Sequence, residues 1–243
     1  MDKREQNLGP GAIVGLIFAS IFVLLVLAVL PIRIFFFQPF QMPSGSMMPT
    51  LLVGDYFFVS KSSYGYSRYS LPFSSPLFSG RVFASEPQRG DMVVFRLPKD
   101  DLVDFVKRIV GLPGDRIQMI NGVLQINGQP VKHERIDDFV GDDGVRVQRY
   151  RETLPNGVVY TTLNLTNNGF YDNTPVYAVP PGHYFMMGDN RDNSTDSRVL
   201  SSVGYVPFEN LIGRVGIIFF SNKPASDNAP SEMRYERIGT VVH

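Results

Sequence analysis

The hydropathy pattern begins with one uninterrupted apolar run near the amino terminus, AIVGLIFASIFVLLVLAVLPI, which spans residues 12–32. Its 21 residues are long enough to cross the hydrocarbon core of a bilayer as a helix, at about 1.5 Å per residue. A cleaved signal peptide is the alternative, but its apolar part is shorter and ends at a small-residue site, whereas Pro31, Ile32 and Arg33 end this run. The pattern therefore predicts an uncleaved transmembrane signal anchor.

The charges that flank the apolar run predict its orientation. Lys3, Arg4 and the amino terminus precede the run, whereas Arg33 alone follows it closely and Lys61 comes next. Basic flanks tend to remain in the cytoplasm. The pattern therefore predicts that residues 1–11 are cytoplasmic and that the remainder of the chain lies outside.

Phenylalanines gather directly after the anchor, at Phe35, Phe36, Phe37 and Phe40. Aromatic side chains are enriched where a membrane meets water, which favours a membrane-contact segment. Aromatic side chains are also enriched in buried strands. The sequence leaves both interpretations open.

The pattern then changes to short segments with the character of strands. Their apolar residues alternate with polar ones or form short runs, and Gly, Asp or Asn bounds most of them. Asn121-Gly122 is a favourable hairpin turn within one segment. No helical period longer than two turns follows the anchor, so the body is predicted to be mainly β. The segments are LLVGDYFFVSK, GDMVVFRL, DFVKRIVGL, DRIQMINGVLQING, YFMMGDN and NLIGRVGIIFF.

Two stretches interrupt this pattern and suggest a domain organisation. Residues 62–90 are rich in Ser, Pro and aromatics and predict a long loop or extended hairpin. Residues 133–169 contain several Gly and Asn turn signals and predict a smaller β subdomain inserted into the main one. The main β domain is thus expected in two parts, 33–132 and 170–243.

Composition narrows the possible functions. The 23 basic residues equal the 23 acidic ones, so no nucleic-acid footprint is present and no nucleic-acid partner is predicted. The chain has no cysteine, which excludes disulfides, thiolate metal sites and cysteine catalysis. A chain of 243 residues with 44% hydrophobic content suits one anchor and one folded domain of about 200 residues.

The segment QMPSGSMMPTLLVGDYFFVSK places Ser44-Gly45-Ser46 among methionines and prolines, shortly after the anchor. A plain linker would be polar and would not lead into an apolar strand. A serine nucleophile would need a base that takes its proton. The three histidines lie in the polar insertion, in a turn and at the terminus, and no G-x-S-x-G elbow is present, which disfavours a Ser-His-Asp site. They are His133, His183 and His243.

Lysine is the other candidate base, and Lys107 differs from the remaining lysines. In DFVKRIVGL the period of two places Phe105, Lys107 and Ile109 on one face, and Arg108 points away from them. Burial there would lower the pKa of Lys107 from about 10.4 toward the value of about 7–8 that suits a base. A strand lysine whose ammonium reaches solvent is the alternative. The other lysines stand in polar, turn or terminal settings: Lys3, Lys61, Lys99, Lys132 and Lys223.

The segment MGDNRDNSTDSR concentrates acidic, amide, hydroxyl and guanidinium side chains. A solvated loop is the ordinary interpretation of such a segment. Asp192, Ser194 and Asp196 have the alternating spacing of a calcium loop, but Ser197 replaces the turn glycine and Val203 the final Glu. No metal is therefore predicted. A third interpretation is a polar network that orients a buried lysine.

The blocks PSGSMMPTLLVGD, GDMVVF, VKRIVGLPGD and GDNRDNSTDSR, in this order after an anchor, resemble bacterial type I signal peptidase, also called leader peptidase. The resemblance covers most of the chain, and the last block is its most specific part. It implies a signal-peptidase/LexA-like β fold and a membrane-bound serine endopeptidase that removes signal peptides from exported preproteins without a cofactor. It also implies a single-pass protein of the bacterial inner membrane, with its catalytic domain on the periplasmic side, in contact with lipid and near the translocon.

The resemblance assigns roles to individual residues. Ser46 corresponds to the nucleophile and Lys107 to the general base. Ser44 corresponds to a hydroxyl that stabilises the oxyanion, and Ser194 to a serine that hydrogen-bonds and orients the lysine. Two supporting ion pairs are implied, Asp196 with Arg198 and Asp189 with Arg108.

A substrate pocket with an apolar wall is expected beside Ser46, and the resemblance implies small substrate residues, mostly Ala, at the first and third positions before the cut. Residues 62–90 match no motif of the family. A LexA-like self-cleaving or pilus-processing Ser/Lys protease is one alternative. A non-enzymatic, membrane-tethered β domain that binds extracytoplasmic segments is another. The expected pocket residues are Met42, Pro43, Met47, Leu51, Phe105 and Val106.

Overall fold

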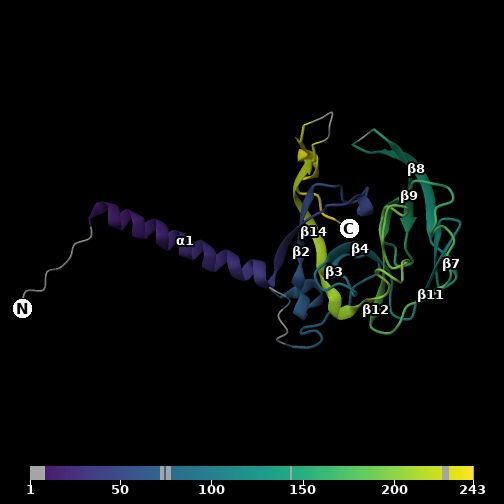
Figure 1. Cartoon of the computed structure of the whole chain (residues 1–243), viewed down its shortest axis with the longest axis horizontal. Coiled ribbons are helices and arrows are strands. Elements are labelled where there is room, and N and C mark those ends of the chain that lie inside the picture. Colours follow the sequence, from purple (N-terminus) through teal and green to yellow (C-terminus); the bar gives the residue numbers. More distant parts are fainter. Residues whose placement is uncertain (1–8, 72–73, 75–77, 143, 226–229, 243) are drawn as a thin grey trace, which may run out of the picture.

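One long helix projects from a β body in this computed structural model (Figure 1). The structure describes residues 9–71, 74, 78–142, 144–225 and 230–242. Most of the predicted cytoplasmic segment, residues 1–8, lies outside the described residues, as does His243.

Helix α1 (Pro10–Phe35) contains the predicted anchor. Pro10 suits a first helical position because its missing N–H would have no partner there. Pro31 lies inside the helix, which nonetheless continues three residues past the predicted end at Ile32. The apolar side chains described along α1 are exposed, and within it Val14–Arg33 is long and apolar enough to cross a membrane.

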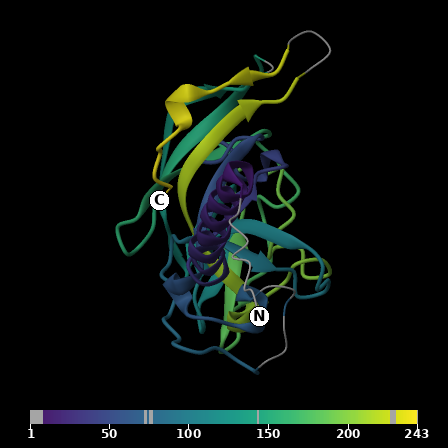
Figure 2. The same ribbon diagram turned by 90° about the vertical axis from the view of Figure 1, so that its left-hand side faces the viewer.

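The main sheet has eight antiparallel strands and runs in the order β1-β2-β14-β3-β4-β12-β13, with β15 paired to β14. Register shifts along β14 bend this strand, whose curvature is visible in Figure 2. The mainly β prediction is confirmed. The strands are β1 (Phe37–Gln41), β2 (Asp55–Ser60), β3 (Met92–Arg96), β4 (Asp104–Gly111), β12 (His183–Met187), β13 (Val206–Pro207), β14 (Leu211–Lys223) and β15 (Glu232–Met233).

Two smaller sheets cover the side of the body that faces away from α1 (Figure 1). One has the order β11-β5-β6-β7, and the other the order β10-β9-β8. The predicted hairpin joins β5 to β6, where Asn121 and Gly122 both have positive φ, 49° and 75°. The strands are β5 (Arg116–Ile120), β6 (Val123–Ile126), β7 (Gln129–Pro130), β8 (Lys132–Val140), β9 (Arg146–Thr153), β10 (Val159–Asn164) and β11 (Tyr177–Ala178).

The three-stranded sheet β10-β9-β8 lies within the stretch 133–169 that the sequence predicts as an insertion. The division of the chain into domains stays a prediction. The described part of residues 62–90 forms a loop with short 3-10 turns and an isolated bridge between Tyr66 and Val82. The Arg81 guanidinium fastens this loop to the body by donating to the carbonyl oxygens of Gly65 and Phe208.

The phenylalanines after the anchor divide between the two interpretations. Phe35, Phe36 and Phe37 are exposed. Phe40 packs on the core beside Phe57, with 6.3 Å between the ring centroids. The alternation of β1 explains this division, because Phe37 and Phe40 lie on opposite faces of the strand.

Candidate active site

Ser46 lies in a single 3-10 turn, Gly45–Met47, that follows β1. The Met48 N–H donates to the Gly45 carbonyl and closes the turn at 3.2 Å. A Cβ on Gly45 would lie 3.0 Å from the Met48 sulfur, so a larger residue would crowd the turn. The Thr50 hydroxyl donates to Asp189 at 2.5 Å and ties the turn to a distant segment.

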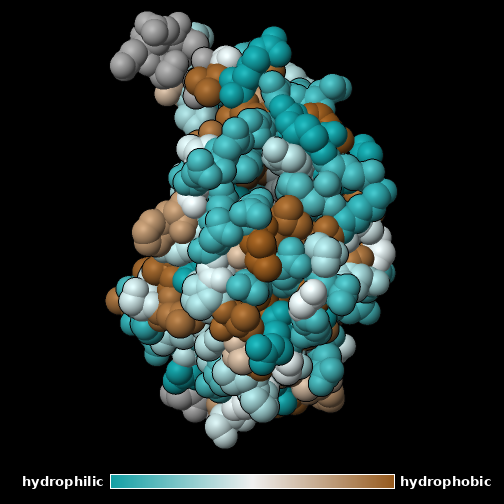
Figure 3. Space-filling view, turned by 90° about the vertical axis from the view of Figure 1, so that its right-hand side faces the viewer, coloured by the Kyte–Doolittle hydropathy of each residue, from teal (hydrophilic) through white to brown (hydrophobic). Residues whose placement is uncertain are grey.

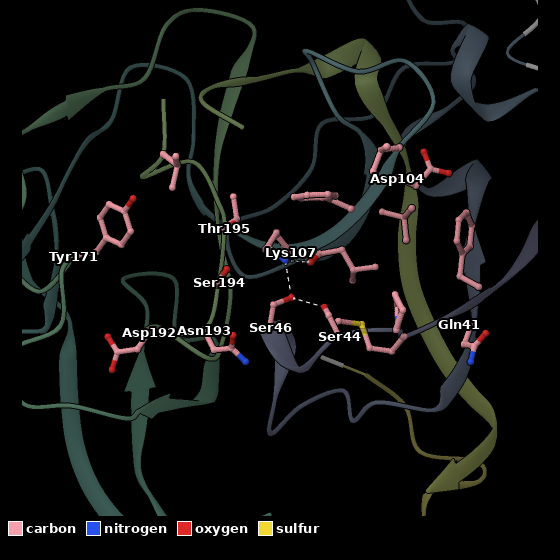
Figure 4. A pocket seen from close by; sticks show the side chains of 18 residues that line it. Gln41, Ser44, Ser46, Asp104, Lys107, Tyr171, Asp192, Asn193, Ser194 and Thr195 are labelled. Atoms are coloured by element: carbon pink, nitrogen blue, oxygen red, sulfur yellow. Dashed lines mark hydrogen bonds between the residues drawn. The ribbon is translucent and has the colours of Figure 1, made fainter. Parts of the chain in front are cut away.

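Lys107, on β4, brings its ammonium nitrogen to Ser46. The Lys107 Nζ lies 2.7 Å from the Ser46 Oγ and donates to the Val106 carbonyl at 2.9 Å. Both side chains are buried, since Ser46 is 7% and Lys107 4% exposed. Figure 4 shows Ser46 between Lys107 and Ser44. The arrangement has the geometry of a nucleophile with its base.

Burial lowers the pKa of Lys107 from 10.5 to about 8. The negative charges of Asp196 and Asp189 act in the opposite direction, and the positive charge of Arg198 adds to the lowering. A substantial share of Lys107 is therefore neutral slightly above neutral pH, and a neutral amine can accept a proton from serine.

The segment 188–198 follows β12 and packs beside this pair, and it forms both expected ion pairs. The Arg108 Nε and Nη2 donate to the two Asp189 oxygens, each at 2.8 Å. The Arg198 Nε and Nη2 donate to Asp196 at 2.9 and 2.8 Å. All four side chains are buried, and each of their charges is neutralised by a bidentate partner of opposite charge.

Ser194 lies in the same segment, but its position differs from the expectation. The Ser194 Oγ donates to Asp196 at 2.8 Å. The hydrogen bonds of Lys107 among the described residues go to Ser46 and Val106 instead. The Ser194 hydroxyl therefore donates to a carboxylate two residues away, and a hydrogen bond between Ser194 and Lys107 stays a prediction.

Ser44 and Asn190 complete the surroundings of Ser46. The Ser44 Oγ lies 3.2 Å from the Ser46 Oγ, on the exposed side of the turn. The Asn190 N–H donates to the Ser46 carbonyl at 3.1 Å, and its side-chain amide donates to the Gly45 carbonyl at 3.0 Å. Asn190 was not predicted as a site residue, and its place inside the polar block was the only signal for it.

A cavity of about 760 Å³ opens beside Ser46 and Lys107. Four expected residues line it: Met42, Pro43, Phe105 and Val106. The expectation for Met47 and Leu51 is wrong, because both are fully buried and absent from the cavity wall. The 3-10 turn Gly45–Met47 directs Met47 into the core, and Leu51 follows it, with its backbone N–H donating to the Met47 carbonyl at 2.9 Å.

The cavity has further wall residues that sequence reasoning missed, among them Phe40, Val94 and Tyr171. Phe40 precedes Met42 by two positions and so continues its face along the β1 segment. Val94 pairs with Val106 across β3 and β4. Strand alternation could have predicted Phe40 and Val94 as wall residues, whereas Tyr171 lies in a loop.

Neither described histidine lies at Ser46. The His133 Nδ1 lies 3.1 Å from Glu152 Oε1, and the His183 Nδ1 lies 2.9 Å from the Pro181 carbonyl. Neither ring lines the cavity. The described residues therefore offer Lys107, rather than histidine, as the proton acceptor for Ser46.

Lys61 is a second buried lysine, which begins the 3-10 turn Lys61–Tyr64. It is 3% exposed, and its backbone N–H donates to the Phe36 carbonyl at 2.9 Å. Burial, together with the nearby charge of Arg33, lowers the pKa of Lys61 to about 8. Lys61 does not line the cavity at Ser46.

Comparison with known proteins gives concordant matches. Residues 16–220 match the family described as signal peptidase, peptidase S26. Signal peptidase I of Rickettsia typhi is 49% identical over 214 residues, which cover 85% of this chain and 80% of the relative. Signal peptidase I of Rickettsia prowazekii is 47% identical over 228 residues, with coverage of 90% and 85%. A crystal structure of a signal peptidase I from Enterococcus faecalis V583 is 27% identical and covers 54% of this chain and 97% of its own, at a TM-score of 0.33.

Proposed function

The chain belongs to the signal peptidase family, peptidase S26, and we propose that Ser46 is its nucleophile and Lys107 its general base. Its relatives at 47–49% identity are signal peptidases I, so it is a peptidase that removes signal peptides from preproteins. Its exposed apolar helix makes it a single-pass membrane protein. The observation that carries the assignment is the distance of 2.7 Å between Lys107 Nζ and Ser46 Oγ in a buried site.

In the first step, neutral Lys107 accepts the proton of Ser46 as the Oγ attacks the scissile carbonyl carbon. The Ser44 hydroxyl and the Ser46 N–H stabilise the oxyanion of the tetrahedral intermediate. The carbon–nitrogen bond then breaks, and the Lys107 ammonium returns its proton to the leaving amine. The signal peptide is left as an ester on Ser46.

In the second step, Lys107 takes a proton from a water molecule, which attacks the ester. The ester bond breaks, the Lys107 ammonium passes its proton to the Ser46 Oγ, and the signal peptide leaves with a new carboxyl group, which releases its own proton to water. Asp189, Asp196, Arg108 and Arg198 neither gain nor lose protons in this scheme. Their paired charges hold the segment 188–198, and Ser194 supports Asp196 rather than Lys107 itself.

The cavity wall supports a substrate with small apolar residues before the cut. Met42, Val94 and Val106 belong to one core cluster and present apolar side chains to the cavity beside Ser46. Small apolar side chains such as alanine would be removed from water against this wall. We expect small residues, mostly Ala, at the first and third positions before the cut.

We further propose that the enzyme works at the periplasmic face of the bacterial inner membrane, in contact with lipid and near the translocon from which its substrates emerge. An apolar cavity of about 800 Å³ lies between α1 and the outer face of the sheet, with Val29, Phe37, Phe58 and Ile217 in its wall. This apolar side suits lipid. The opposite face is largely hydrophilic with scattered apolar residues (Figure 3).

The test is cleavage of a purified preprotein by the full-length chain in detergent, with the products identified by mass. The wild-type protein should cut once, after a small residue, and Ser46→Ala should not cut. A wild-type protein that leaves the preprotein intact would contradict the function. Unchanged cleavage by Ser46→Ala would contradict the assignment of the nucleophile.

A further inference from the structure

The three-stranded sheet β10-β9-β8 lies on the side of the body away from α1 and supplies none of the residues that line the described cavity at Ser46 (Figure 1). One carboxylate of this sheet is nevertheless buried against the segment 188–198, which does line the cavity. Glu152, on β9, is 0% exposed. It accepts hydrogen bonds from Arg191 at 3.0 and 2.5 Å and from the Tyr160 hydroxyl at 2.6 Å.

Arg191 belongs to the segment 188–198, and its contacts connect that segment to the sheet. Its Nε donates to the Gly188 carbonyl at 3.2 Å, and its own carbonyl accepts from Arg198 Nη2 at 2.6 Å. The backbone adds two bonds to Leu163 of β10. The Arg191 N–H donates to the Leu163 carbonyl, and the Leu163 N–H donates to the Asp189 carbonyl, each at 2.9 Å.

The same segment reaches the reacting groups on its other side. Asn190 donates both its N–H and its side-chain amide to the turn that carries Ser46. The Gly188 N–H donates to Asp196 at 3.0 Å, and the charge of Asp196 acts on Lys107. A small displacement of the segment would therefore alter both the position of Ser46 and the field at Lys107.

Charge explains why Glu152 matters more than an ordinary buried acceptor. The segment and its neighbours bury three guanidinium groups, Arg108, Arg191 and Arg198, against three carboxylates. Removal of one carboxylate would leave Arg191 charged and unpaired in the interior, which is strongly unfavourable. Arg191 would relieve this by moving toward water, and the segment 188–198 would move with it.

We propose that Glu152 is a positioning residue of the peptidase reaction, which holds the segment 188–198 against Ser46 and Lys107 through Arg191. The proposal rests on the proposed function. Tyr160 assists because its hydroxyl binds Glu152 and its ring lies 4.3 Å beneath the Arg108 guanidinium. The inserted sheet thereby contributes to catalysis without contact with the substrate.

The test compares Glu152→Gln with the wild-type full-length chain in detergent, at a temperature well below the melting point of each. Glutamine keeps the size of the side chain and removes its charge. We expect kcat for preprotein cleavage to fall about 10²-fold, as displacements of about 1 Å do. The acidic limb of the kcat/KM profile should shift as well, because a displacement of the segment 188–198 changes the field of Asp196 at Lys107.

Asp115→Asn is the matched control. Asp115 is also buried and pairs with an arginine, Arg89, at 2.8 Å, but its contacts lie outside the segment 188–198. It should lose thermal stability while its kcat stays at the wild-type value. A folded Glu152→Gln protein that behaves like this control would overturn the proposal, because its role would then be structural only.

Tyr160→Phe provides a second variant if Glu152→Gln fails to fold. It removes the hydrogen bond that the Tyr160 hydroxyl donates to Glu152 and the one that it accepts from Arg191, and it keeps the ring under Arg108. We expect kcat to fall about fivefold, equivalent to about 1 kcal/mol. An unchanged kcat would overturn the proposal. A wild-type protein that does not cleave, or a Ser46→Ala protein that does, would instead contradict the proposed function.

Discussion

Replacement of the proposed general base with methionine, Lys107→Met, should abolish cleavage and at the same time stabilise the protein near neutral pH. Lys107 is 4% exposed, and burial lowers its pKa from 10.5 to about 8. In the unfolded chain the lysine regains its ordinary pKa. Between these two values the unfolded state binds more protons than the folded state, so the wild-type stability rises with pH. Below about pH 8 the lysine is charged in both states, and its burial lowers the free energy of unfolding by the full amount.

The magnitude follows from the two pKa values. The difference between 10.5 and about 8 corresponds to about 3 kcal/mol, at about 1.4 kcal/mol per pH unit. Lys107→Met removes this cost and fills the same apolar space. The variant should therefore gain about 3 kcal/mol at pH 7, about 1 kcal/mol at pH 10 and nothing well above pH 10.5. Lys61 is present in both proteins, so its own contribution cancels from the comparison.

The assay is denaturant unfolding of the full-length chain in detergent at pH 7 and pH 10. The chain has 11 Tyr and no Trp, so near-ultraviolet circular dichroism of tyrosine reports on packing in the β body. Ser46→Ala is the control, because it should be equally inactive without the pH-dependent gain. A Lys107→Met protein that is no more stable than wild type at pH 7, or whose gain is the same at pH 10, would refute the argument.

Three further predictions concern activity. The kcat/KM of the wild type should rise about tenfold from pH 7 to pH 9, as Lys107 loses its proton. His133→Gln and His183→Ala should show the same rise with pH, and its loss in either variant would indicate a histidine base. Ser44→Ala should lower kcat about 10²–10³-fold in steady-state cleavage with little change in KM, and an unchanged kcat would remove Ser44 from the mechanism. A chain without residues 1–32 should fold and cleave but need detergent or lipid for its full rate, and a monodisperse truncated protein that is indifferent to detergent would contradict the membrane-contact surface.

The sequence predicted those parts of the molecule that depend on the local pattern and spacing of apolar and polar residues. The apolar run marked α1, and alternation or short apolar runs identified β2, β3, β4, β12 and β14 of the main sheet. The same alternation set Lys107 apart from Arg108, and the structure directs the two side chains to different partners, Ser46 and Asp189. The family resemblance supplied the pairing of Asp196 with Arg198, which alternation alone did not.

The features that sequence reasoning missed depend on contacts between distant segments. Glu152 and Arg191 are 39 positions apart, and nothing in the local pattern of β9 indicates an ion pair with the segment 188–198. Lys61 is buried by the elements around it, so its polar neighbours in sequence were misleading. Met47 turns inward because of a single 3-10 turn, which a period of two or 3.6 does not describe, and Leu51 is buried after that turn.

The most direct test of the Ser46–Lys107 pair is a comparison of Ser46→Ala, Lys107→Ala and the double variant in single-turnover cleavage of one preprotein. Two groups that act as one unit lose their effect together, so their separate losses do not add. We predict that all three proteins are folded and cleave at the same background rate. Substantial cleavage by Lys107→Ala, or a double variant whose loss is the product of the two single losses, would contradict the account.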